Sequence, residues 1–174
     1  MTAKFSMSAV VALAAGLFIV SGCVSKGTIK DSPRLESNRV VIPPMEKLNP
    51  REMSLNIVDN RAPEFKNHSA EISAELTRVL TLALGRQNIA LKSNAPNQLT
   101  LTIQDYKTAE FQEGCVLLNG SLDIPKKGKA NASANSCMEF KSFGRKVGAD
   151  IGAAYENALS EVFKGLNSGL EQMP

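Results

Sequence analysis

The chain has 174 residues, of which 43% are hydrophobic, 21% are charged and only 5% are aromatic, with no Trp. This length fits one ordinary globular domain. The formal net charge of +3 is too small to indicate a nucleic-acid partner. A single His and three Cys show no zinc-ligand spacing, so the composition argues against a metal or redox enzyme and predicts no metal site and no cofactor.

The first 22 residues predict a signal peptide. Lys4 precedes an uncharged apolar stretch from Met7 to Val20, which at about fourteen residues is shorter than the roughly 20 that cross a bilayer. It ends in Val20-Ser21-Gly22-Cys23, which looks like a bacterial lipobox. In that class the cysteine thiol receives a diacylglyceryl group, cleavage precedes the cysteine, and the new amino group is acylated, with palmitate for example. The alternatives are a plain secretory peptide and an N-terminal membrane helix.

Cys23 is therefore the predicted lipidation site, and two or three acyl chains would anchor the chain in a membrane without spanning it. Val24, rather than Asp, follows Cys23, and by analogy with the enterobacterial sorting rule this predicts the periplasmic face of the outer membrane. Residues 23–51 contain several prolines and predict a lipidated N-terminus and a tether. The apolar patch Val40-Val41-Ile42 has the alternative of docking as an edge strand.

Residues 52–174 predict a single domain. Alternating or helically spaced apolar residues indicate strands at 53–59, 89–91, 98–106, 115–124 and 130–140. They also indicate a helix that begins at the cap candidates 67–69 and stops near 85–88, and a second helix at about 147–170. Each helix has one apolar stripe. The predicted fold is therefore an α+β two-layer sandwich, with a mainly antiparallel sheet and two amphipathic helices on one face.

One face of the sheet is predicted to remain open. Leu99, Leu101 and Ile103 alternate with Thr100 and Thr102, so this strand has an apolar face and a hydroxyl-bearing face. Such alternation is typical of a sheet that is covered on one side only.

The register of the last two strands can be predicted from their turn. If the turn centres on Lys126, Cys115 lies directly opposite Cys137 on the face away from the apolar residues. Opposed residues of an antiparallel pair are about 4.5 to 5.5 Å apart at Cα, which a disulfide can bridge. Because an exported chain meets an oxidising compartment, we expect a disulfide between them. The alternative is two free thiols.

This layout resembles the YajG family of small outer-membrane lipoproteins. The resemblance rests on the lipobox, the tether, the order of strands and helices, and the Asp59-Asn60-Arg61 motif at the end of the first strand. It implies an envelope location and a two-layer fold. Similar designs occur in the lipopolysaccharide-assembly lipoprotein LptE and in auxiliary lipoproteins of ABC-type transport systems.

No pattern of catalytic residues is found in the sequence. It lacks a nucleophile elbow, a phosphate-binding glycine loop and a His-Glu-x-x-His helix. His68, the single histidine, falls where the first helix begins and is interpreted as an exposed residue near the helix cap. Asp59 and Arg61 are candidates for contact with an anion or a polar partner, with a local ion pair as the alternative.

Two functions remain at this stage, and neither is enzymatic. The first is an envelope lipoprotein that binds a protein partner, as an assembly factor, through its open sheet face or sheet edge. The second is a carrier or sensor of a small apolar or lipid ligand held between helices and sheet, where Gly148, Gly152 and Ala153 would leave room. An auxiliary lipoprotein of a transport system is a further alternative. The sequence predicts a membrane and an envelope protein as partners.

Overall fold

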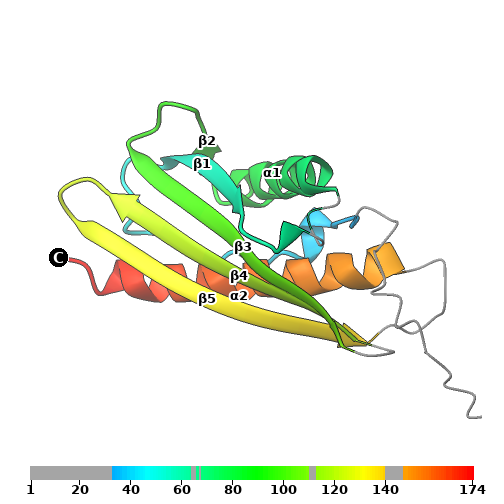
Figure 1. Cartoon of the computed structure of the whole chain (residues 1–174). Coiled ribbons are helices and arrows are strands. Elements are labelled where there is room, and N and C mark those ends of the chain that lie inside the picture. Colours follow the sequence, from blue (N-terminus) through cyan, green and yellow to red (C-terminus); the bar gives the residue numbers. More distant parts are fainter. Residues whose placement is uncertain (1–32, 64–65, 67, 110–112, 140–146) are drawn as a thin grey trace, which may run out of the picture.

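The computed structural model describes residues 33–63, 66, 68–109, 113–139 and 147–174. The predicted signal peptide 1–22, Cys23 and the first part of the tether lie outside these residues. The α+β two-layer prediction is confirmed, since two helices pack on one face of an open five-stranded sheet (Figure 1). The elements in chain order are η1 (Ser37–Arg39), β1 (Glu52–Asp59), α1 (Ser69–Gly85), β2 (Ala90–Leu91), β3 (Asn97–Ala109), β4 (Glu113–Ile124), β5 (Gly128–Glu139) and α2 (Val147–Glu171).

The sheet is mixed in direction. Its strand order is β2-β1-β3-β4-β5, and β1 runs parallel to both of its neighbours. β3, β4 and β5 are antiparallel to one another. β1 is parallel to β2 and β3 because α1, which follows β1 in the chain, carries the chain back along the sheet. β2 and β3 therefore begin at the same end of the sheet as β1. β3, β4 and β5 are the three longest strands, so the prediction of a mainly antiparallel sheet is confirmed, and the parallel pairing is confined to β1 with its two neighbours.

Both helices bury the apolar stripes that the sequence predicts. Ile72, Leu76 and Leu80 of α1 are buried, as are Leu159 and Leu166 of α2. The chain leaves α1 through Asn88, which has a φ of 56°, a conformation that Asn tolerates well. The helices and the sheet enclose one continuous apolar core.

Residues 33–50, which we name the strap, lie within the predicted tether but are packed against both helices. Polar contacts hold the strap. The Leu35 amide donates to Glu75 of α1 at 3.0 Å, and the Val41 amide donates to Ser160 of α2, also at 3.0 Å. The strap residues buried in the core are Leu35, Val40, Ile42, Met45 and Leu48. The packed domain therefore begins well before residue 51, and the Val40–Ile42 patch docks on the helix layer, not as an edge strand.

The register of the β4–β5 hairpin is as predicted. Cys115 is opposite Cys137 and Val116 is opposite Ser136. A disulfide joins the two cysteines, whose Sγ atoms are 2.02 Å apart. Lys126, at the predicted centre of the turn, has a φ of 68°. The bond therefore links the ends of β4 and β5 that lie farthest from the turn.

Reduction of this disulfide is expected to lower the free energy of unfolding by about 2 kcal/mol, because the unfolded hairpin gains conformational freedom. Urea denaturation with and without reductant measures the effect. The double variant Cys115→Ser/Cys137→Ser should match the reduced protein and be insensitive to reductant. Alkylation of both thiols by iodoacetamide in the folded, unreduced protein would show that the disulfide bond is absent.

Candidate functional site

The open face of the sheet is built by the alternation of side chains along β3, β4 and β5. Leu101 of β3 and Leu118 of β4 point into the core and are fully buried. The residues between such positions point to the opposite side, which neither α1 nor α2 covers (Figure 1). Thr100 and Thr102 lie on this side, as the sequence predicts.

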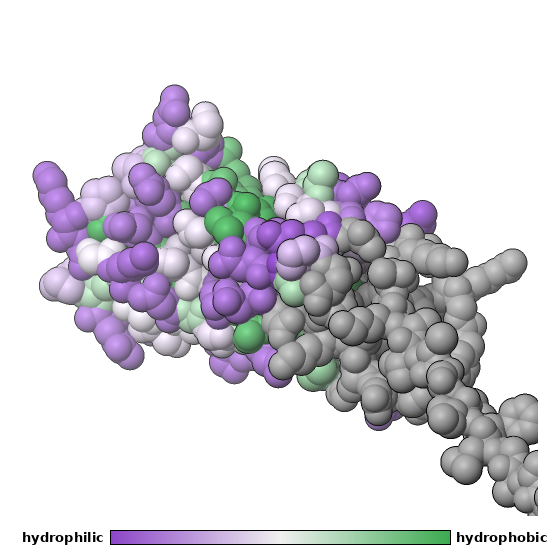
Figure 2. Space-filling view, in the orientation of Figure 1, coloured by the Kyte–Doolittle hydropathy of each residue, from purple (hydrophilic) through white to green (hydrophobic). Residues whose placement is uncertain are grey.

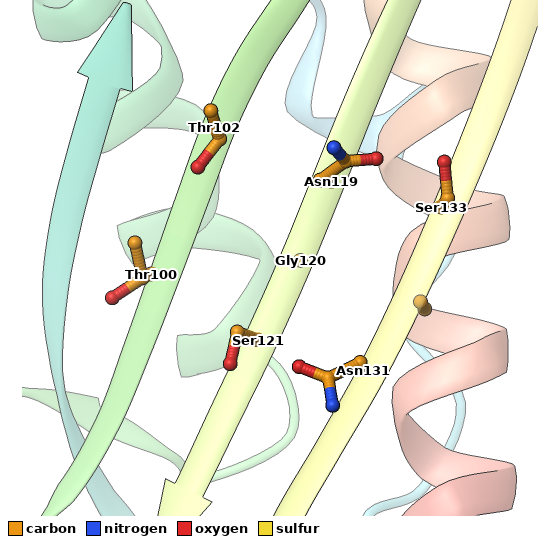
Figure 3. A pocket seen from close by; sticks show the side chains of 8 residues that line it. Thr100, Thr102, Asn119, Gly120, Ser121, Asn131 and Ser133 are labelled. Atoms are coloured by element: carbon orange, nitrogen blue, oxygen red, sulfur yellow. The ribbon is translucent and has the colours of Figure 1, made fainter.

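A shallow hollow of about 430 Å³ lies on this face. Figure 3 shows polar side chains from three strands projecting around it, with the helix ribbons behind the sheet. The polar residues that line it are Thr100, Thr102, Asn119, Ser121, Asn131 and Ser133. In Figure 2, hydrophilic and near-neutral residues cover most of the described surface, with small hydrophobic patches among them. Apart from Gly120 and Ala132, the residues that line the hollow carry hydroxyl or amide groups, and none of them has an ionisable side chain.

Its chemistry is that of hydrogen bonding. Hydroxyl and amide side chains both donate and accept, so they match peptide groups and other neutral polar groups. A hydroxyl needs a nearby base to act as a nucleophile. His68 lies at the start of α1, on the far side of the sheet, with its Nδ1 atom 3.7 Å from a carboxylate oxygen of Glu71. Hydroxyl and amide groups in this arrangement can form hydrogen bonds with a partner, and none of the residues that line the hollow is a base that could activate a hydroxyl.

Among the residues that the structure describes, no group of three or more His, Cys, Asp and Glu side chains is placed to hold a metal ion. None of the described helices has both the length and the apolar character needed to cross a membrane.

Asp59 and Arg61 form a buried ion pair at the end of β1. Arg61 donates to the two carboxylate oxygens at 2.9 and 2.7 Å, and Ser69, the first residue of α1, donates to the same carboxylate. Burial raises the pKa of Asp59, but the hydrogen bonds from Arg61 and Ser69 outweigh it and lower that pKa to about 2. The two side chains are only 4% and 9% exposed. The pair therefore joins β1 to α1 and is not a surface contact for a partner.

Tyr155 of α2, part of the predicted apolar stripe of that helix, belongs to the same buried region, a position that the sequence does not indicate. Its side chain is 1% exposed, and burial raises its pKa to about 12, with Arg61 and Asp59 near enough to influence it. Among the described residues its hydroxyl has no hydrogen-bond partner. Only the fold brings Tyr155 near Asp59, so no local pattern in the sequence indicates this neighbour.

The small residues of α2 serve close packing. A Cβ atom at Gly152 would lie 2.0 Å from the carbonyl oxygen of Arg34 in the strap. At Gly165 and Gly169 it would lie 2.7 and 2.9 Å from the Cβ atoms of Ala132 and Ala130 in β5. Of the three small residues expected to leave room for a ligand, Gly152 is closely covered by the strap, so no room for a ligand remains at that position.

The fold and this face define a two-layer α+β domain with an open sheet surface, whose hollow is lined by uncharged side chains. No family model and no curated protein sequence matches the chain. The YajG resemblance therefore rests on the layout of the sequence alone.

Similar solved structures include proteins described as bacterial lipoproteins. A DUF330 protein from Xanthomonas campestris has 15% identity and a TM-score of 0.49, over 80% of this chain and 92% of that chain. A lipoprotein from Neisseria meningitidis has 12% identity and a TM-score of 0.35, over 62% and 96%. A minor lipoprotein from Acinetobacter baumannii has 9% identity and a TM-score of 0.35, over 71% and 94%.

Proposed function

We propose that this protein is a non-enzymatic envelope lipoprotein, anchored through Cys23 at the periplasmic face of the outer membrane, which binds a protein partner through its open sheet face. The lipobox Val20-Ser21-Gly22-Cys23 supports the anchor. The hollow with its six hydroxyl and amide side chains carries the proposal for binding.

Neutral polar side chains suit a protein partner. Burying a charge in an interface costs free energy unless the charge is paired, whereas a hydroxyl or amide can be satisfied by a single peptide group. The lining side chains come from three adjacent strands that hold them in fixed positions. A preformed surface of this kind loses little conformational entropy when a partner binds.

Site-specific photo-crosslinking in cells tests the binding face. A crosslinking residue in place of Asn119 or Ser121, both lining the hollow, is expected to capture the same envelope protein. The matched control is Thr81, an exposed threonine on α1, which should not capture it. If neither position in the hollow gives a reproducible adduct, or if Thr81 gives the same one, the open face is not the binding surface.

The strap limits how far the domain can stand from the membrane. Because the strap is fixed to both helices, only the residues between Cys23 and Pro33 can separate the lipid from the folded domain. About ten residues reach at most about 35 Å. The proposed partner must therefore meet the open face close to the membrane surface.

Loss of the anchor is expected when Cys23 is replaced. Cys23→Ala should abolish labelling by palmitate and release the protein from the membrane fraction, because no acyl chain can be attached at that position. Metabolic labelling and membrane fractionation measure both effects. Cys115→Ala is the control, since its side chain is placed in the hairpin disulfide and the variant should remain lipidated. Labelling that persists in Cys23→Ala would contradict the assignment.

A further inference from the structure

Among the described strands, β5 is a long edge strand whose central part lacks the residues that usually protect an edge. It is the last strand of the sheet and pairs with β4 over twelve residues in an unbroken register. From Ala130 to Met138 its sequence contains no charged residue and no proline. Edge strands of natural proteins are normally blunted by charges, prolines or bulges, because their free peptide groups accept a further strand. The opposite edge, β2, has only two residues.

The cysteine pair identifies the peptide groups that face outward. The Cα atoms of Cys115 and Cys137 are 4.0 Å apart, which corresponds to the closely spaced, non-hydrogen-bonded type of antiparallel pair. Cys137 and the other odd-numbered residues of β5 therefore direct their N–H and C=O groups away from β4. The side chains of these residues lie on the open face.

The charges at the ends of β5 are arranged for pairing with a second copy. Lys129 and Glu139 are both exposed and lie near opposite ends of the strand. An antiparallel pair of β5 strands with its two-fold axis at Ala134 places Lys129 opposite Glu139 of the second copy, twice in the dimer. This register also opposes odd-numbered residues to odd-numbered residues, so the outward peptide groups of the two strands meet.

We propose that the protein forms a two-fold symmetric dimer through antiparallel pairing of β5 with β5 of a second copy. The two sheets then become one sheet of ten strands, five from each copy. The open faces of the two copies join into one surface, because the odd-numbered residues of β5 have their outward peptide groups at the strand edge and their side chains on the open face.

Charge exchange tests the register. The mature lipidated chain, purified in detergent, is expected to be a dimer by light scattering, and two differently tagged copies expressed together should co-purify. Lys129→Glu and Glu139→Lys should each weaken dimerisation about tenfold or more. The double variant Lys129→Glu/Glu139→Lys should restore it, because each glutamate again faces a lysine. A monomeric wild type, or a double variant no better than the singles, would refute the proposal.

A second pair of variants tests the strand edge. Ser133→Pro removes an outward N–H group without removing a bond to β4, and it is expected to abolish dimerisation. Ser133→Ala keeps the peptide group and should remain dimeric. If Ser133→Pro fails to fold, the charge variants still decide. A folded Ser133→Pro variant that is still a dimer would overturn pairing with a second copy. So would a wild-type protein that is monomeric and binds a different protein, if Ser133→Pro abolishes that binding.

Discussion

Gly152→Ala is expected to lower the free energy of unfolding by about 3 kcal/mol, because overpacking against backbone cannot be relieved by a side-chain rotation. The new Cβ atom would lie 2.0 Å from the carbonyl oxygen of Arg34. Moving that carbonyl would displace the neighbouring Leu35 amide from Glu75, 3.0 Å away, and the Glu36 amide from Glu156. Glu156 is 2% exposed, and burial raises its pKa, so loss of this partner leaves a buried carboxyl group less satisfied.

Gly85→Ala is the matched control for this variant. Both glycines lie in α-helices, but a Cβ atom at Gly85 would have no atom within 4 Å. The control is expected to be stabilised by about 0.5 to 1 kcal/mol from helix propensity alone. Urea denaturation measures the free energies, and limited proteolysis should show cleavage within residues 33–50 in Gly152→Ala only. Equal stability of Gly152→Ala and wild type, with the strap still protected, would show that the strap does not need this close approach.

The strap shows why part of the fold could not be predicted from sequence. Its buried residues, such as Leu35, Met45 and Leu48, have neither helical nor strand spacing and are interrupted by prolines. Their environment is supplied by α1 and α2, and the α2 partners are more than one hundred residues away in sequence. A segment of this kind has the composition of a tether, and only the tertiary structure distinguishes the two.

The two halves of the sheet also differ in how far the sequence predicts their strand pairing. The β4–β5 hairpin was predictable down to the pairing of Cys115 with Cys137, because a short turn fixes the register of its strands. The parallel pairing of β1 with β2 and β3 is set by packing across α1, and no local signal specifies it. The open face follows from simple alternation along β3, so the sequence alone places Thr100 and Thr102 on the face that carries the hollow.

Asp59→Asn is expected to destabilise the fold by about 3 kcal/mol, because removal of one partner from a buried ion pair leaves the other charge poorly compensated. The variant keeps the size of the side chain but loses the carboxylate to which Arg61 donates at 2.9 and 2.7 Å. The control is Asp123→Asn, since Asp123 is an exposed carboxylate on β4 and its loss should change stability by no more than about 0.5 kcal/mol.

The effect of Asp59→Asn should depend on pH in a defined direction. The pKa of Asp59 is lowered from 3.8 to about 2 in the folded protein, so the folded state holds the carboxylate in its ionised form more strongly than the unfolded chain does. The resulting stabilisation is complete above about pH 4 and is lost as the pH falls through about 2, which amounts to about 2 kcal/mol. Denaturation curves of wild type and Asp59→Asn should therefore converge between pH 4 and pH 2, whereas the Asp123→Asn curve should stay close to that of wild type throughout. A constant difference between wild type and Asp59→Asn over this range would mean that the ion pair does not set the pKa of Asp59.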